Sequence, residues 1–177
     1  GAQTIGGSAT TFYNLIVNKT AGTCFLGGGN HTVDNQLTLT AGPLNLNSRT
    51  IIINNALTTA ITRTAGYAIS ENTGNLSKIQ WNIGASTGSY VYPFGTSGGL
   101  YIPFTVNVTA ATIGNVTCST YPTAADNTPW PVTPQTVTNL NSTTSLIPDN
   151  RFATVDRFWQ IDKTGGSGTA TLTFSYL

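Results

Sequence analysis

Charged side chains are scarce in this sequence. They make up 7% of its 177 residues, and the chain has one histidine, no methionine and a formal net charge of +1. An average soluble protein carries roughly 25% charged residues. The few Lys and Arg residues stand singly, whereas nucleic-acid binding needs clustered positive charge to neutralise phosphates. We therefore expect no nucleic-acid partner.

Long hydrophobic runs are absent as well. No uncharged stretch approaches the ~20 predominantly apolar residues that a membrane-spanning helix needs. We therefore expect no membrane span. The chain also shows no signal peptide and begins at Gly1 rather than at Met, which is consistent with a processed form or with an excerpt of a longer protein.

Only two cysteines are present, Cys24 and Cys118, and they lie far apart in the sequence. In an oxidising compartment they could close one long disulfide loop. Equally, each could be a small buried apolar residue. The two cysteines fall in different predicted regions of the chain, and both interpretations remain open.

Thr, Asn, Ser and Gly supply the polarity that charge does not, and this composition indicates an all-β protein. Thr favours strands because its branched Cβ suits an extended backbone. Asn and Gly supply turns that need positive φ. Between residues 36 and 55, apolar side chains stand two apart in short bursts, with turn-forming residues between the bursts. These side chains are Leu37, Leu39, Leu44, Leu46, Ile51 and Ile53.

Strands this short need neighbours on which their apolar sides can stack. For residues 1–86 we therefore predict a short-stranded, β-helix-like solenoid, with rows of Thr and Asn forming ladders between the coils. The spacing between corresponding runs is uneven and shows no clean repeat period. An ordinary antiparallel meander is the competing interpretation.

The composition changes near residues 84–90. Beyond this point the predicted strands are longer and richer in aromatic residues, and residues 122–150 form a long Pro-, Thr- and Asn-rich connection. For residues 87–177 we predict an antiparallel β-sandwich of jelly-roll or immunoglobulin-like kind.

One short motif matches a serine-hydrolase signature, G-x-S-x-G at residues 95–99. A nucleophile elbow is followed by a helix, but the next residues, LYIPFTVNV, have the pattern of a strand. A triad also needs His and Asp beside the Ser. His31 is the only histidine, and Asp34 is the only Asp that precedes Ser97. We predict a Gly/Ser hairpin here and no catalytic residue.

Carboxylates are few and scattered. Glycoside hydrolysis needs two of them facing each other across the sugar, and the predicted solenoid contains only Asp34 and Glu71, with no basic cluster to bind an acidic sugar. We therefore expect no enzyme and no metal centre. A bound calcium is the one cofactor considered, because oxygen ligands from loops suffice; its candidate ligands are Asp126, Asp149, Asp156 and Asp162.

Aromatic residues offer a weak carbohydrate-binding site, since flat rings stack on sugar faces. Tyr90 and Tyr92 share one face of a predicted strand, and Trp130 lies in a loop between two prolines. Core packing of the sandwich is the competing interpretation of these side chains.

The run TFYNLIVNKTAG, followed by NQLTLTAGPLNLNSRTIIINN, the strand YIPFTVNVT and the ending GTATLTFSY resemble Thr/Asn-rich repetitive segments of large secreted cell-surface proteins, adhesin-like, of Bacteroidetes. The resemblance covers most of residues 8–177 and is one of texture, without a catalytic signature. It implies a secreted, cell-surface or extracellular location, export by a type IX-like route, and a structural or adhesive role. The sequence contains no sorting domain of that route.

We therefore expect a non-enzymatic extracellular structural protein, a subunit or stalk segment of a surface fibre or adhesin. Open sheet edges must be capped or paired, and neither terminus has an evident cap. We expect the chain to associate head to tail with copies of itself, as a homopolymer joined by strand-edge pairing. The alternative is a carbohydrate-binding module that uses Trp130, Tyr92 and Tyr90 on surface glycans.

Overall fold

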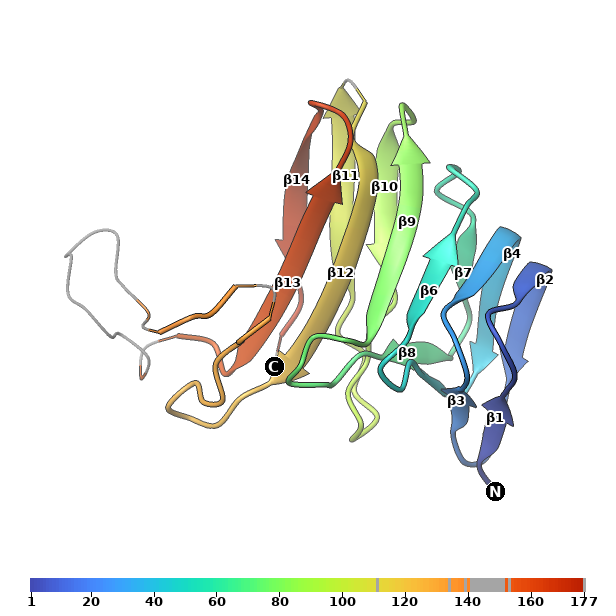
Figure 1. The fold of residues 1–177 in the computed structure, drawn as a ribbon, viewed down its shortest axis with the longest axis horizontal. Coiled ribbons are helices and arrows are strands. Elements are labelled where there is room, and N and C mark those ends of the chain that lie inside the picture. Colours follow the sequence, from blue (N-terminus) through green and yellow to red (C-terminus); the bar gives the residue numbers. More distant parts are fainter. Residues whose placement is uncertain (111, 134, 139, 141–151, 153, 177) are drawn as a thin grey trace.

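The structure, a computed structural model, describes residues 1–110, 112–133, 135–138, 140, 152 and 154–176. It is all-β, with 52% of residues in strands and 1% in helix. The strands of the described residues, labelled in Figure 1, are β1 (Gln3–Ile5), β2 (Thr11–Asn18), β3 (Cys24–Leu26), β4 (His31–Ala41), β5 (Pro43–Asn45), β6 (Thr50–Ile53), β7 (Ile61–Arg63), β8 (Tyr67–Ile69), β9 (Lys78–Gly84), β10 (Gly88–Tyr92), β11 (Phe104–Ala110), β12 (Gly114–Pro122), β13 (Arg157–Thr164) and β14 (Thr169–Phe174).

The first half of the chain winds into a β-solenoid-like stack of about three turns, as predicted. Successive coils contribute short strands to a four-stranded parallel sheet, in the order β1-β3-β5-β8. They also contribute strands to a seven-stranded sheet, in the order β13-β12-β9-β6-β4-β2, with β7 beside β4. The competing antiparallel meander is wrong for this half, because every pairing among β1 to β8 is parallel.

The coils are held by the aliphatic side chains that the alternating pattern predicted to point inward. Each is 0% exposed, and burying one stabilises the fold by about 1.5–3 kcal/mol. They come from β4, β6 and the segment that includes β5: Leu37, Leu39, Leu44, Leu46, Ile51 and Ile53.

The corners of the coils repeat a tripeptide that reveals the period. Thr-Ala-Gly occurs at residues 20–22, 40–42 and 64–66, each time where the chain leaves the seven-stranded sheet. Gly42 has φ +72°, and a Cβ there would overlap the carbonyl oxygen of Lys19 in the preceding coil. Glycine is required because coils approach each other this closely. The period is irregular because the third coil carries extra residues between β6 and β8.

Side-chain amides form the predicted ladder on the outer face of the seven-stranded sheet. Asn35 Nδ2 donates to Asn14 Oδ1 at 2.7 Å, across β4 and β2. Further along, Asn54 Nδ2 donates to Asp34 Oδ1 at 2.7 Å, and Asn82 Nδ2 donates to Asn54 Oδ1 at 2.8 Å. These bonds join neighbouring coils side chain to side chain, in addition to the backbone pairing.

Strand β9 is where the pairing changes. It runs parallel to β6 on one side and antiparallel to β12 on the other. Beyond it, β10, β11 and β14 form a three-stranded antiparallel sheet. A parallel bridge between Ala68 and Phe94 joins this sheet to the four-stranded one. The molecule therefore has two layers, the seven-stranded sheet and, opposite it, the two smaller sheets edge to edge (Figure 1).

Aromatic rings fill the space between the layers in the second half. Trp81 of β9 packs edge-on against Tyr90 and Tyr92 of β10, with ring centroids 5.0 and 5.7 Å apart. Trp159 of β13 meets Phe174 of β14 at 5.3 Å. The aromatic-rich strands of the second half thus form the two walls of one interior.

A separate jelly-roll or immunoglobulin-like sandwich is not confirmed. Residues on both sides of the predicted boundary, 1–86 and 87–177, contribute to one hydrophobic cluster that extends from Val17 to Cys118. The seven-stranded sheet also crosses that boundary through β9 and β12. The antiparallel strands continue the layers that the coils begin. The division into two domains stays a prediction.

Candidate functional site: a buried polar network and the open strand edges

The serine motif lies in a tight loop, as predicted. Gly95 bridges to Tyr101 in antiparallel fashion, and Leu100 N donates to Thr96 Oγ1 at 3.0 Å. Ser97 N donates to Glu71 Oε2 at 2.9 Å. His31 has other partners: it is fully buried, its Nδ1 accepts from Thr10 N at 3.3 Å, and its Nε2 lies 2.9 Å from the Gly27 carbonyl. The structure does not join Ser97 and His31.

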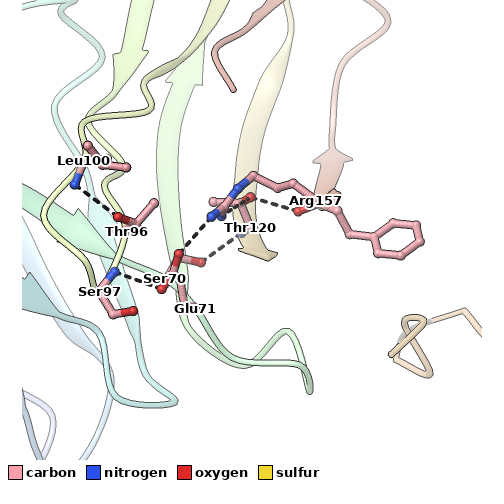
Figure 2. A network of polar contacts seen from close by, with 8 residues as sticks. Ser70, Glu71, Thr96, Ser97, Leu100, Thr120 and Arg157 are labelled. Atoms are coloured by element: carbon pink, nitrogen blue, oxygen red, sulfur yellow. Dashed lines mark hydrogen bonds and ion pairs between the residues drawn. The ribbon is translucent and has the colours of Figure 1, made fainter. Parts of the chain in front are cut away.

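Glu71 belongs instead to a buried polar network, which Figure 2 shows. Its Oε1 lies 2.9 Å from Arg157 Nη2, and the two side chains are only 10% and 8% exposed. Arg157 Nη1 donates to Thr120 Oγ1 at 3.2 Å, and Thr120 N donates to Ser70 Oγ at 2.9 Å. The network therefore ties the segment after β8 and the loop that holds Ser97 to the ends of β12 and β13.

The contacts of this network hold neighbouring segments together, and we call the Glu71–Arg157 pair at its centre a structural clamp. Both carboxylate oxygens of Glu71 already accept hydrogen bonds. Asp34, the other carboxylate considered for sugar chemistry, is exposed and accepts from Asn54. The structure thus gives Asp34 and Glu71 separate partners and does not bring them together. Sequence reasoning missed the pairing of Glu71 with Arg157, which are 86 residues apart.

Two of the three predicted carbohydrate-binding residues are inaccessible. Tyr90 and Tyr92 are 0% exposed. Their hydroxyls donate to the carbonyls of Ala56 and Val116, at 2.8 and 2.9 Å. A fully buried ring cannot stack on a sugar, so this prediction is wrong for both tyrosines. The competing interpretation is correct for both tyrosines, since their rings pack in the core.

The third residue, Trp130, is half-buried. It stands next to Pro131, which lines a cavity of about 200 Å³ at the edge of β13. Phe158 and Trp159 supply aromatic walls to this cavity, and Gln160 and Asp162 supply polar atoms. The sequence did not indicate this cavity, because its walls come from segments that are separated by more than twenty residues.

The two cysteines are unpaired. Cys24 lies in β3 and Cys118 in β12, on opposite layers, and both thiols are free and buried. Burial raises the pKa of the Cys24 thiol and raises that of Cys118 well above its ordinary value. Of the two interpretations left open by the sequence, the disulfide is wrong, and each cysteine is a small buried residue.

Neither a metal cluster nor a membrane helix occurs in the described part of the chain. No three His, Cys, Asp or Glu side chains gather there in a way that could hold a metal ion. Among the calcium candidates, Asp126, Asp156 and Asp162 are described, and Asp149 lies outside the described residues. No helix within the described ranges is long and apolar enough to cross a membrane.

Comparison with known proteins gives no family. Neither a protein-family model nor a curated protein nor a solved structure matches this chain.

The most distinctive surfaces are the strand edges at the two ends of the layers. At one end, β1 and β2 are the last strands of their sheets among the described residues. Strand β2 contains no charged residue, and it exposes Tyr13 (71%) and Ile16 (66%). Phe12 and Leu15, on the other face of β2, are half-buried. We call this surface the first-coil end.

At the opposite end, β13 and β14 are the last strands of their sheets in the described chain. Strand β14 is also uncharged, and it exposes Leu172 and Phe174, each 40%. Between the two strands opens an apolar cavity of about 200 Å³, lined by Ile161 of β13, Ala170 and Leu172 of β14, and core valines behind them. We call this surface the β13/β14 end.

Proposed function

We propose that this chain is a non-enzymatic extracellular structural protein, a subunit or stalk segment of a surface fibre or adhesin. It associates head to tail through open β edges. One observation carries this proposal: both layers end in strands that have no further strand beside them among the described residues, at the first-coil end and at the β13/β14 end.

The side chains on these edges support the proposal. An open edge presents a row of unpaired N–H and C=O groups, and soluble proteins commonly protect it with Lys, Pro or a covering loop. Of the four edge strands, β13 contains charged residues, Arg157, Asp162 and Lys163. Neither β2 nor β14 contains Lys, Arg, Asp, Glu or Pro, and both expose large apolar side chains to solvent. Edges of this kind favour pairing with another strand.

The extracellular setting is supported by composition and by resemblance. The chain carries 7% charged residues and is rich in Thr, Asn, Ser and Gly, as are the secreted Bacteroidetes surface proteins that it resembles. The outer face adds side-chain hydrogen bonds between coils, such as the one that Asn54 donates to Asp34. An elongated scaffold needs such cohesion along its axis.

The test is the assembly state of the purified chain of residues 1–177. We expect its weight-average mass in sedimentation velocity to rise with concentration above the 18.5 kDa of the monomer. Negative-stain electron microscopy of the same samples should show linear particles. A chain that stays monomeric at millimolar concentration would refute the proposal.

A matched pair of variants distinguishes edge pairing from nonspecific hydrophobic association. Ile16→Lys places a charge on the β2 edge, where Ile16 is 66% exposed. Leu57→Lys places the same charge on a side chain that is 60% exposed and lies outside the strands. We expect Ile16→Lys to abolish assembly and Leu57→Lys to leave it intact, because only the first disturbs an open edge.

Carbohydrate binding is the second candidate, and the cavity beside Pro131 favours it. Its aromatic walls and its polar Gln160 and Asp162 have the chemistry that a sugar requires. On a glycan array, we expect a bound glycan to be lost on Phe158→Ala and kept on Phe152→Ala, since Phe152 is exposed elsewhere. An array without any binding would remove this candidate.

A further inference from the structure

This inference rests on the proposed function and specifies its partner surface. We propose that the β13/β14 end binds the first-coil end of a second copy of this chain. The second copy is related to the first by translation, and both layers then continue from copy to copy through parallel strand pairing.

Strand directions in the seven-stranded sheet carry the first step. From β2 through β4 and β6 to β9, every pairing is parallel. From β9 to β12, and again from β12 to β13, the pairing is antiparallel. Two reversals cancel, so β13 runs in the same direction as β2. A translated copy would place its β2 beside β13 in parallel, as β2 already lies beside β4.

The opposite layer gives the same result independently. Its strands β1, β3, β5 and β8 are all parallel. The bridge from Ala68 of β8 to Phe94, just after β10, is parallel too. Strand β11 is antiparallel to β10, and β14 is antiparallel to β11. Strand β14 therefore runs in the same direction as β1, so one translation extends both layers at once.

Both ends present apolar side chains. The β13/β14 end has an apolar cavity lined by Ile161, Ala170 and Leu172. The first-coil end has the half-buried side chains of Phe12 and Leu15. An apolar cavity at one end and half-buried apolar side chains at the other favour contact between unlike ends.

The charges of β13 have partners within the chain, at the rim of the cavity and away from it. Arg157 pairs with Glu71 at 2.9 Å, and Asp162 pairs with Lys78 at 3.8 Å. Lys163 lines the cavity, but its ammonium group donates to the carbonyls of Gly166 and Gly168, both at 3.2 Å. The alkyl stem of Lys163 is the part available to an apolar partner. Burial of this rim by a second copy leaves the ammonium with its carbonyl partners.

Register across the sheet selects the residues for a test. One row of paired residues crosses the seven-stranded sheet from β2 to β13, and it consists of Thr11, Thr32, Ile52, Gln80, Thr117 and Asp162. If the row continues into the next copy, Thr11 of that copy lies beside Asp162. Tyr13 of that copy then lies near Thr164, and both of these side chains are exposed.

The experiment uses two single variants of the full chain, Tyr13→Cys and Thr164→Cys, and a short flexible bis-maleimide. The native cysteines are buried, and the wild-type chain controls for them. We expect cross-linked dimers in the mixture of the two variants, at least tenfold more than in either variant alone. A heterologous contact joins unlike sites, so a single variant has no partner thiol.

Three other outcomes overturn the inference in distinguishable ways. Efficient dimers of Tyr13→Cys alone, or of Thr164→Cys alone, would show two-fold pairing of like ends. Assembly in sedimentation without cross-links in the mixture would show another contact surface and leave the proposed function standing. A chain that never assembles would refute both.

Discussion

The parallel and antiparallel halves of this molecule form the same two layers with different side chains. In the parallel half, aliphatic residues stack from coil to coil, and glycine corners such as Gly42 bring the coils close together. In the antiparallel half, aromatic rings such as Trp81 and Tyr92 fill the interior between the layers. One two-layered architecture can therefore continue across a change in strand direction, provided that side chains fill the interior.

Trp81, at the joint between the two halves, is the position where we expect a substitution to have the largest effect. Trp81 is 0% exposed, touches two tyrosines of β10 and donates from Nε1 to the Asn55 carbonyl at 2.9 Å. We expect Trp81→Ala to lower the free energy of unfolding by about 3–5 kcal/mol, because it leaves a large cavity between the halves. Urea denaturation followed by circular dichroism measures this loss.

The same titration tests whether the halves are cooperative. We expect a single transition for the wild-type chain, with coincident curves from circular dichroism and fluorescence. Two separate transitions would show that the halves are independent domains, and Trp81→Ala would then shift only one of them. Leu57→Ala, at an exposed position, is the control and should change stability by less than ~0.5 kcal/mol.

The Glu71–Arg157 clamp is expected to have the next largest effect. Arg157→Ala leaves the Glu71 carboxylate buried without its cation, which costs about 3 kcal/mol or more. Glu71→Gln combined with Arg157→Leu removes both charges and should recover part of that loss. Thermal and urea unfolding of these two variants and of the wild-type chain measure both changes. Equal stability of the single and double variants would mean that the ion pair is not the source of the effect.

The glycine corners sharpen the contrast between the halves. Gly42 has φ +72° and no room for a Cβ, whereas Gly84 has φ +63° and open space. A left-handed backbone alone costs roughly 1–2 kcal/mol for a residue with a Cβ. We therefore expect Gly84→Ala to lose about 1 kcal/mol and Gly42→Ala to lose at least about 2 kcal/mol. Losses of equal size would contradict the close packing of the coils.

The amide ladder should contribute less. Asn54→Ala removes its bonds to Asp34 and Asn82. A hydrogen bond at a partly exposed site contributes about 0.5–1.5 kcal/mol net. We expect a loss in this range from urea denaturation, against little change for Asn18→Ala at an exposed position outside the ladder. An Asn54→Ala chain as stable as wild type would show that these side-chain hydrogen bonds do not stabilise the fold.

Alkaline pH should weaken the antiparallel half through groups that are buried in their neutral form. Burial raises the pKa of Tyr92 and of the Cys118 thiol well above their ordinary values of 10.0 and 9.0. Such groups stabilise the fold fully below their unfolded pKa, and the contribution is lost as the pH rises above it. We expect the melting temperature to fall above pH ~9, less steeply in Cys118→Ala. Parallel pH profiles would contradict this assignment.

Much of the fold could be predicted because it depends on local alternation. The inward aliphatic residues of the coils follow period 2, and the composition excludes helices. The Thr-Ala-Gly tripeptides at residues 20–22, 40–42 and 64–66 would have revealed the period of the coils. The apolar runs of successive coils do not show the same period, because the register between neighbouring strands shifts, for example between Phe12 and Asn14.

The site was harder to predict because its contacts join distant residues. Tyr90 and Tyr92 alternate correctly with Val91, but alternation does not say which face is buried. Their hydroxyls find carbonyl partners 34 and 24 residues away, which local sequence does not show. Likewise, the sequence does not show that β13 runs in the same direction as β2, because this depends on every strand pairing between them.

Amide hydrogen exchange of the edge strands is the most direct test of assembly through open β edges. We would compare residues 1–177 at micromolar and at millimolar concentration, strand by strand. We expect β2 and β14 to gain protection together as concentration rises, while the loop around Leu57 stays unchanged. Protection that does not change with concentration, or that rises in only one of the two edges, would contradict assembly through open β edges.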